Sequence, residues 1–356
     1  MKKQYIIPIF VPHLGCPNDC IFCNQRSISG QLEEVSVDDV KNTVDFYLKN
    51  LKEKDVYKEI AFFGGSFTGI DISKQEKLLK VAYEYVKNGD INSIRVSTRP
   101  DYINKDILKM LKKYKVKVIE LGVQTSNDYL LDRCKRNHNF EDVKKASKLI
   151  RRKGFILGHQ MMVGLPESTK NDEIKTAKDL ADLKPKMVRI YPVLVIKNTE
   201  LEVEYNNGEY IPLSLEQAVE RCKELYYFFR RKKIEVIRIG LQNTDIISSP
   251  DNKESQVVAG PYHEAFGQLV EDAVWYDSIV DRIKQFNVKV KEVEISVNPI
   301  NVNNIIGHKK ENVNKLKELY DVDVKIIQDY EIKPGDLNIK ILKKYSDFLE
   351  ENKLKK

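Results

Sequence analysis

The sequence has 356 residues, of which 42% are hydrophobic and 32% are charged, a composition typical of a globular protein with a sizeable core. Lysine and arginine total 60 against 53 aspartates and glutamates, and the net charge of +7 permits a polyanionic partner without requiring one. Five cysteines in so long a chain exclude a disulfide-stapled scaffold, and no stretch predicts a membrane span. We expect a cytoplasmic protein with more than one domain.

Apolar runs of strand length alternate with amphipathic helical stretches over the first 240 residues. The expected strands are residues 5–10, 59–63, 93–98, 118–122, 156–163 and 187–195, with a probable seventh at 234–241. The expected helices are residues 37–54, 75–86, 105–114, 141–153, 171–183 and 214–233. This alternation predicts a parallel α/β sheet with right-handed crossovers. Six βα units are too few for a closed barrel and favour an open, partial (β/α)6 TIM-type barrel.

Residues whose side chains or backbone could bind a ligand or take part in a reaction lie at or near the ends of these strands. They are the cysteines after the first strand, Gly64, Gly65 and Ser66 after the second, Thr98 and Arg99 after the third, Gln124 after the fourth, Met162 in the fifth and Tyr191 in the sixth. Functional groups of barrel enzymes lie at the carboxyl ends of the strands. We therefore expect one site, built from these loops.

Three cysteines, Cys16, Cys20 and Cys23, stand in the spacing C-x3-C-x2-C. Thiolates are soft ligands that suit zinc and iron–sulfur clusters. Three of them on a cluster of four irons leave one iron open for a small molecule. A zinc site completed by His13 or by a distant cysteine is the alternative.

This spacing, with Phe22 before the last cysteine, resembles the signature of the radical S-adenosylmethionine (SAM) enzymes. The resemblance implies a [4Fe-4S] cluster on Cys16, Cys20 and Cys23, whose open iron binds SAM. Cleavage of SAM would then give a 5′-deoxyadenosyl radical. Phe22 is expected near the adenine of SAM, and the oxygen-sensitive cluster implies a reducing compartment.

The same resemblance assigns roles to the other loops. Gly64 and Gly65 are similar to the Gly-Gly-Glu motif that holds the SAM amino group, although Ser66 stands in place of the acid. Arg99 is suited either to a bidentate pair with the SAM carboxylate or to a surface position that caps the following helix, and Ser97 or Thr98 is suited to a bond with the ribose.

Further residues are assigned less specific places. Gln124 suits ribose or carboxylate, and Met162 is expected to pack near adenine or in the barrel core. Tyr191 is either a packed core residue, which we favour, or a neighbour of the radical site. Loop 133–138, with His138, is expected to contact phosphates or solvent. His159 is expected to be a satisfied core residue.

Within these enzymes, several stretches resemble one branch, the Elongator catalytic-subunit-like proteins and the relatives of oxygen-independent coproporphyrinogen oxidase. The stretches are residues 62–68, 97–101, 120–125, 158–166, 189–195 and 260–271. The Elongator catalytic subunit modifies wobble uridine in tRNA, but no acetyltransferase domain is expected here. His263 and Glu264, in the last stretch, are candidates for acid–base or substrate-binding roles, or for a structural one.

The tail resembles a KH RNA-binding module, which clamps nucleic acid with a G-x-x-G loop. Its loop would be residues 307–310, where Lys310 replaces the second glycine and Lys309 and Lys310 supply charge. The alternative is a KH-shaped domain for dimerisation or packing, and we favour RNA contact. We expect a barrel over residues 1–240, an extension packing on it over 241–287, and a KH-like α+β domain over 288–356.

These observations predict a radical SAM enzyme that modifies RNA, with tRNA favoured over ribosomal RNA as the partner. The expected electron donor is a flavodoxin or ferredoxin. The alternatives are a coproporphyrinogen-oxidase-like or haem-handling protein, and an enzyme that modifies a ribosome-associated protein.

Overall fold

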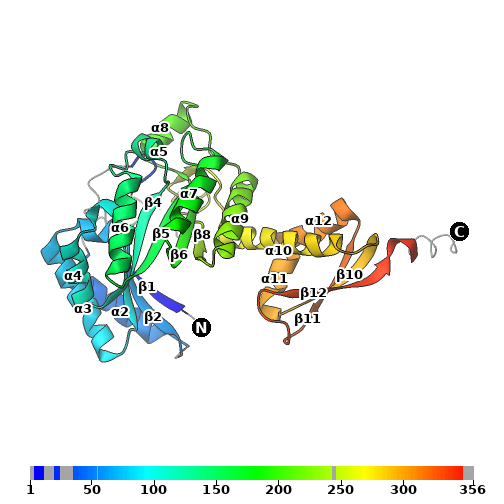
Figure 1. Ribbon diagram of the computed structural model, residues 1–356, viewed down its shortest axis with the longest axis horizontal. Helices are drawn as coiled ribbons and strands as arrows, with labels where there is room; N and C mark the ends of the chain where they lie inside the picture. The colour runs from blue at the N-terminus through cyan, green and yellow to red at the C-terminus, as the bar shows by residue number, and fades with distance from the viewer. Residues whose placement is uncertain (1–3, 12–19, 25–34, 54, 243–245, 348–356) are drawn as a thin grey trace. The chain divides into compact units, whose positions relative to one another are not determined.

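The computed structural model describes residues 4–11, 20–24, 35–53, 55–242 and 246–347. The chain divides into two compact units, Met1–Glu264 and Ala265–Lys356. Figure 1 shows both units, which we describe separately. Cys16 and His13 lie outside the described residues.

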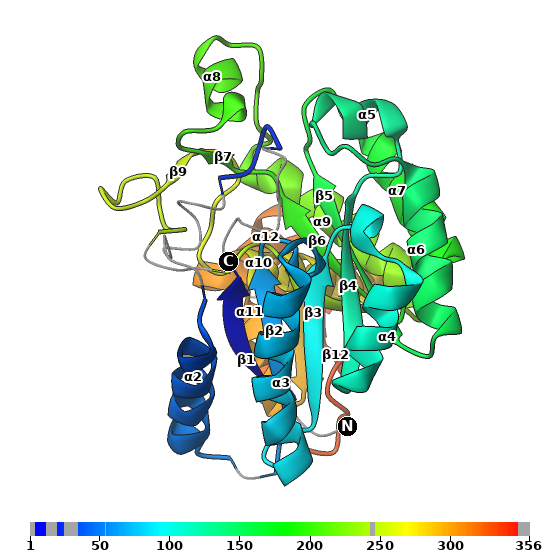
Figure 2. The ribbon, with the colours of Figure 1, turned by 90° about the vertical axis from the view of Figure 1, so that its left-hand side faces the viewer.

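A seven-stranded parallel sheet, in the order β1-β2-β3-β4-β5-β6-β8, forms the centre of the first unit. The strands are β1 (Gln4–Val11), β2 (Tyr57–Gly64), β3 (Ser93–Thr98), β4 (Val116–Gln124), β5 (Ile156–Val163), β6 (Met187–Pro192) and β8 (Glu235–Ile239). The sheet curls into an open half-barrel (Figure 2). The predicted α/β partial barrel is confirmed, including its probable seventh strand.

Helices cover the outer face of this sheet. They are α2 (Val37–Asn50), α3 (Ile72–Asn88), α4 (Lys105–Lys113), α6 (Phe140–Arg152), α7 (Lys170–Asp182) and α9 (Leu215–Arg231). Side chains cap several of their N-termini: Ser36, Asn139, Thr169 and Ser214 each form a capping box. Each such cap stabilises its helix by about 1 kcal/mol.

The two faces of the sheet differ in polarity because neighbouring residues along a strand point to opposite sides. The outer face is apolar, with Ile60, Phe62 and Val96 fully buried under the helices. His159 points the same way and bonds Ser147 of α6 at 2.9 Å, so it is a core histidine as predicted, although its Nδ1 has no hydrogen-bond partner among the described residues. Arg95, on the other register of β3, lies on the inner face and is buried there.

Shorter elements extend the carboxyl-end side of the half-barrel. The helices are α5 (Asp128–Arg133) and α8 (Glu200–Asn206), and the antiparallel strands are β7 (Val195–Ile196) and β9 (Val257–Ala259). No helix among the described residues is long and apolar enough to cross a membrane.

The second unit is a small α+β domain. Its strands are β10 (Val290–Val297), β11 (Asp323–Gln328) and β12 (Leu337–Lys344), and its helices are α10 (Phe266–Lys284), α11 (Val302–Ile306) and α12 (Glu311–Tyr320). The central strand β10 pairs parallel with β11 and antiparallel with β12.

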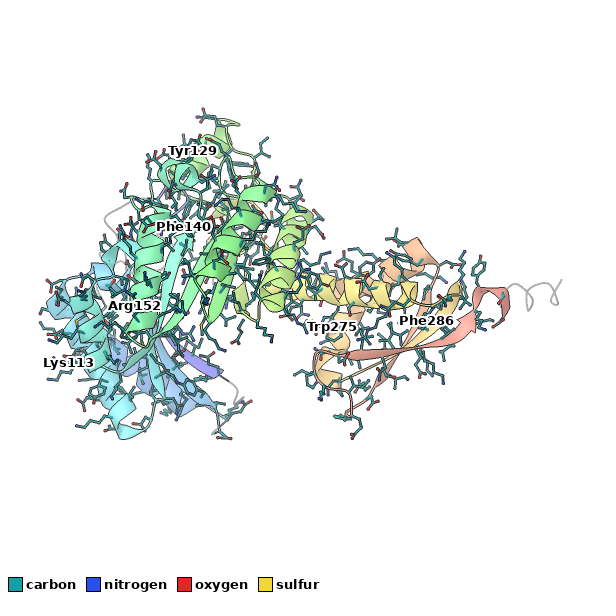
Figure 3. All side chains as sticks on the ribbon, in the orientation of Figure 1. Lys113, Tyr129, Phe140, Arg152, Trp275 and Phe286 are labelled. Carbon is teal, nitrogen blue, oxygen red and sulfur yellow. The ribbon has the colours of Figure 1, made fainter. Side chains whose placement is uncertain are left out.

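The boundary of this unit differs from the expected one near residue 288. Ile279 and Val280 of α10 share a core with Val293 and Ile295 of β10, and Trp275 packs against the same core (Figure 3). The helix therefore belongs to the small unit, and the division falls at residues 264 and 265. The helical periodicity of this stretch does not by itself indicate which core the helix joins.

The basic turn lies between α11 and α12, as predicted. Gly307 has a φ of 75°, and Lys309 and Lys310 have φ values of 49° and 65°. Lys310 thus adopts a left-handed conformation that glycine would adopt at less cost. The turn forms without the second glycine, but the resemblance to a KH module stays a prediction.

Candidate functional site

The ends of β1 and β2 meet at a turn that requires glycine. The Gly65 amide donates to the Val11 carbonyl at 2.9 Å. Gly64 has a φ of 95°, and a Cβ there would lie 2.7 Å from the same carbonyl oxygen. Backbone of the predicted Gly-Gly turn is therefore held against the strand that leads into the cysteine loop.

Cys20 and Cys23, the two described members of the cysteine motif, lie in one short turn. The Cys23 amide donates to the Cys20 carbonyl at 2.9 Å. Cys20 and Phe22 are buried, and Met162 of β5 packs against the same apolar cluster. The structure thus brings together Phe22 and Met162, both predicted to lie near adenine.

Arg136 reaches Cys20 from the loop after α5, and the sequence did not single it out. Its Nη1 donates to Cys20 Sγ at 3.3 Å, and its Nη2 donates to the Gly122 carbonyl at 2.6 Å. The side chain is buried, and its Nε has no hydrogen-bond partner among the described residues. A buried guanidinium therefore lies beside a thiol of the cysteine motif, and its Nε is available to donate a further hydrogen bond.

The prediction that loop 133–138 contacts phosphates or solvent is wrong for Arg136 and His138, which are buried. His138 Nδ1 lies 3.2 Å from the Arg136 carbonyl. Burial, with Arg136 nearby, lowers the pKa of His138 to about 4. A run of basic residues ordinarily lies on the solvated surface. The composition of this loop therefore does not indicate that two of its side chains point into the protein.

Arg99 is buried and already bound to protein groups. Its Nε donates to Asp101 Oδ1 at 3.0 Å, and its Nη2 donates to the Arg136 carbonyl. These bonds fix the loop that carries Arg136.

Three hydroxyls from two strand ends form a buried group. Ser66 Oγ and Thr98 Oγ1 are 2.8 Å apart, and Thr68 also bonds Thr98. Ser66 Oγ accepts a bond from the Arg99 amide at 3.1 Å. The group joins the β2 loop to the β3 loop, which sets the position of the Gly-Gly turn.

Gln124 stands at a bulge where β4 ends, with a φ of 71°. Its Oε1 is buried and has no hydrogen-bond partner among the described residues. Buried polar atoms are nearly always satisfied in native proteins. An unpaired carbonyl oxygen here suggests a position for a ligand hydroxyl or amine.

The inner face of the sheet carries an ion-pair network that the sequence did not reveal. Arg95 joins Glu59 to Glu120, and Arg189 binds both oxygens of Glu120, at 2.6 and 3.1 Å. Burial alone would raise the pKa of Glu120, but Arg189 and Arg95 hold it below its usual value. Tyr191, half-buried beside Arg189, follows on β6; burial raises the pKa of its phenol.

The two cysteines outside the motif, Cys134 and Cys222, are buried. Cys134 packs in the cluster of Cys20 and Phe22, and burial raises its pKa to about 12. Cys222 is fully buried in α9.

Four predicted substrate residues stay predictions. His263 and Glu264 end the first unit, and Lys309 and Lys310 belong to the second.

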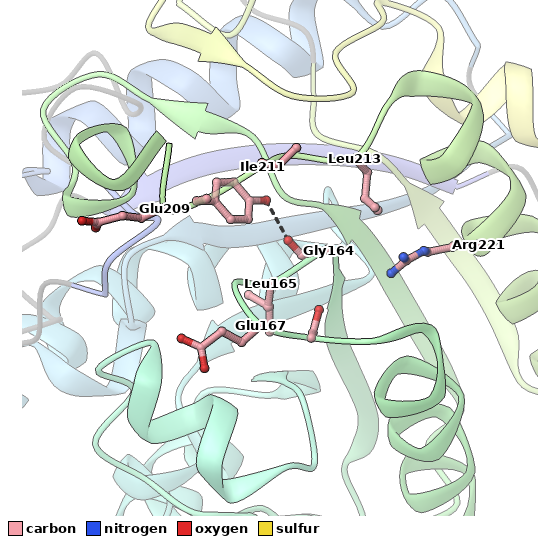
Figure 4. Close-up of a pocket in the computed structure, with 9 residues that line it drawn as sticks. Gly164, Leu165, Glu167, Glu209, Ile211, Leu213 and Arg221 are labelled. Atoms are coloured by element: carbon pink, nitrogen blue, oxygen red, sulfur yellow. Dashed lines mark hydrogen bonds between the residues drawn. The ribbon is translucent and has the colours of Figure 1, made fainter. Parts of the chain in front are cut away.

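A cavity of about 310 Å³ opens beside the end of β5, lined in part by Leu165, Leu213 and Arg221 (Figure 4). Tyr210 Oη donates to the Gly164 carbonyl at 2.7 Å across it. Its arginine is paired with Glu173 at 3.0 Å. None of the predicted site residues lines this cavity.

Comparison with known proteins agrees with this geometry. The profile of the Radical SAM superfamily matches residues 10–180, and that of the Radical_SAM C-terminal domain matches residues 185–275. An uncharacterized protein of Methanocaldococcus jannaschii is 30% identical over 229 residues, covering 61% of this chain and 70% of that protein.

The chain belongs to the radical SAM superfamily.

A tRNA uridine(34) acetyltransferase of Methanocaldococcus jannaschii is 33% identical over 182 residues, or 46% of this chain. The alignment spans only 34% of that enzyme's length. Among solved structures, Elp3 of Methanocaldococcus infernus with an N-terminal deletion has a TM-score of 0.59 at 22% identity, covering 79% of this chain and 64% of that one.

Members of the radical SAM superfamily bind a [4Fe-4S] cluster and SAM. The residues described here fit these groups. A buried cation beside a motif thiol suits an anionic ligand, and the Gly64 turn admits close backbone approach. Oε1 of Gln124, which has no hydrogen-bond partner among the described residues, lies at the end of β4. Because the strands are parallel, this end lies on the same edge of the sheet as the cysteine motif and the Gly64 turn.

Proposed function

We propose that this chain is a cytoplasmic radical SAM enzyme that modifies tRNA. Membership of the superfamily supports the radical chemistry. Relatives named as tRNA uridine(34) acetyltransferases, together with the positive net charge, support an RNA substrate. The observation that carries the proposal is Arg136, buried with its Nη1 3.3 Å from Cys20 Sγ.

When bound, a [4Fe-4S] cluster on Cys16, Cys20 and Cys23 and SAM supply a 5′-deoxyadenosyl radical for hydrogen abstraction. The protein's own groups bind and orient SAM.

Each part of SAM has a partner in this proposal. Backbone at Gly64 and Gly65 accepts bonds from the amino group. Arg136 pairs with the carboxylate, and we favour it over Arg99 because Asp101 already binds that guanidinium. Gln124 accepts a bond from the ribose.

Adenine packs between apolar side chains in this proposal. Phe22 and Met162 belong to one cluster with Cys20, which supports a shared role. The hydroxyls of Ser66 and Thr98 bond each other at 2.8 Å, so they orient the turn rather than face the ligand.

Partners outside the barrel complete the proposal. A flavodoxin or ferredoxin supplies the electron, and Lys309 and Lys310 contact RNA phosphates from the second unit. His263 and Glu264 are candidates for groups that contact the substrate.

Anaerobic incubation with SAM, dithionite and bulk tRNA tests the proposal. We expect 5′-deoxyadenosine together with a nucleoside of changed mass in the digested tRNA. Release of 5′-deoxyadenosine with every nucleoside unchanged would contradict tRNA as the substrate. Copurification of a porphyrin would instead favour the haem-handling alternative.

A further inference from the structure

Two arginines stand side by side on the inner face of the half-barrel. Arg189 of β6 and Arg238 of β8 are register partners in a parallel pair, so their side chains point to the same face. Because Arg189 binds Glu120, that face is the inner one. Two neighbouring cations need compensating negative charge.

Among the described residues, the two carboxylates of this network, Glu59 and Glu120, already have cationic partners. Glu120 accepts bonds from Arg95, from both Nε and Nη2 of Arg189, and from Gln160 Nε2 at 3.0 Å. Glu59 binds Arg95 and also accepts a bond from Gln4 at 2.8 Å. Neither carboxylate is left to pair with a further cation.

Arg238 has only uncharged partners. Its Nε donates to the Gly240 carbonyl at 3.1 Å, and its Nη1 lies 3.5 Å from Gln242 Oε1. Over the described parts of the chain, it forms no ion pair. Burial lowers the pKa of Arg238; the Tyr191 phenol opposes this shift, and the neighbouring Arg189 adds to it. Such a desolvated cation gains more from an anion than an exposed one does.

The position is partly exposed. Arg238 is half-buried, as are Tyr191 and Gln160 on the adjoining strands. Arg189 lies over the half-buried ring of Phe63, 5.1 Å from its centroid. Arg238 is thus a guanidinium without a carboxylate partner among the described residues, flanked by hydrogen-bonding groups and an aromatic ring.

We propose that Arg238, with Arg189 and Tyr191 beside it, forms an anion site that binds a phosphodiester group of the RNA substrate. A guanidinium fork matches two phosphate oxygens. The proposal rests on the function proposed above, because an RNA substrate supplies the phosphodiester. Binding here would place the nucleotide on the inner face, below the strand ends that hold the candidate SAM site.

The test measures the affinity for bulk tRNA by fluorescence anisotropy at several salt concentrations. Arg238→Gln should weaken binding about tenfold and lower the salt slope by about one. Arg238→Lys keeps the charge and should keep the slope. Arg230→Gln removes an equal charge from an exposed position at the end of α9 and should leave binding nearly unchanged.

The outcomes separate this inference from the function on which it rests. If the unaltered protein binds no tRNA, the proposed function fails. If it binds tRNA and Arg238→Gln binds equally well with an equal slope, the function stands and the anion site is wrong. Circular dichroism of each variant verifies the fold. If Arg238→Gln does not fold, Arg238→Lys decides the question: an ammonium cannot form the two-bond fork, so this variant should bind tRNA severalfold more weakly at an unchanged slope, and unchanged affinity would contradict the site.

A competition arm identifies the source of the phosphate. Inorganic phosphate added at constant ionic strength should displace little tRNA, because a diester within a long chain is held by other contacts as well. A variant Arg238→Gln that loses binding of inorganic phosphate but keeps full tRNA affinity would contradict the assignment to RNA.

Discussion

At the residue scale, Cys20 links the sequence motif to the structure. It is buried in the apolar cluster of Phe22 and accepts a bond from Arg136. The motif predicted the thiol, but only the fold brought the guanidinium to it.

Replacement of Cys20 by alanine should remove the cluster, because two remaining thiolates cannot hold it. We expect the visible absorbance of the anaerobically reconstituted protein to disappear, with iron content falling to background. Cys222→Ala is the matched control, since that thiol is fully buried in α9. An unchanged spectrum in Cys20→Ala would overturn the metal assignment.

His159 gives a pH-dependent stability at the same scale. Burial lowers its pKa from 6.5 to about 3. Between pH 6.5 and pH 3, His159 therefore binds a proton in the unfolded chain but stays neutral in the folded chain. Stability is fully present above pH 6.5 and falls as the pH drops toward the folded pKa, by up to about 1.4 kcal/mol per pH unit.

Urea unfolding followed by circular dichroism between pH 7 and pH 4.5 measures this loss. His159→Asn removes the titrating group and should flatten the pH dependence, leaving the part contributed by His138, whose pKa burial also lowers. An equally steep dependence in His159→Asn would show that other groups cause it.

At the scale of elements, the turn after β2 determines how the first two strands meet. Gly64 needs a positive φ and also lacks space for a Cβ. Gly89, at the end of α3, has a φ of 85° but nothing within 4 Å of a Cβ.

Gly64→Ala should therefore destabilise the first unit by about 2 kcal/mol more than Gly89→Ala. Both variants place alanine at a positive φ and share that conformational cost. The difference between their losses of unfolding free energy therefore measures the contact with the Val11 carbonyl. Thermal unfolding followed by circular dichroism measures both. Equal losses would mean that the backbone shifts to admit the methyl group.

At the scale of the whole molecule, the second unit has its own core. The cluster around Val293, Ile295 and Leu316 draws only on residues after 264. Trp275, the single tryptophan of the chain, packs against this core and therefore reports on this unit alone.

Residues 265–356 should fold alone, with a cooperative loss of Trp275 fluorescence in urea at the midpoint seen in the full chain. A fragment beginning at residue 288 lacks α10 and should not fold. Folding of the shorter fragment would restore the boundary predicted from composition.

Much of the fold follows from local pattern. Strand and helix periodicity predicted the seven parallel strands, since alternation of apolar runs is a local property of the sequence. The gathering of the candidate residues at one edge was also predictable, because a parallel sheet brings all carboxyl ends of its strands to one edge. The positions of Arg136 and Arg238 were not predictable, because the sequence around an arginine in a basic loop or strand does not indicate whether its side chain points inward.

The sequence by itself determined the superfamily, through the cysteine spacing and the loops that follow each strand. Only the tertiary structure decided which charges are paired. Asp101 forms an ion pair with Arg99, and Glu120 forms ion pairs with Arg95 and Arg189. Arg136 was left beside Cys20, and Arg238 without a carboxylate among the described residues. The pairs of Glu120 with Arg95 and Arg189 join residues 25 and 69 positions apart, so no local pattern in the sequence records them.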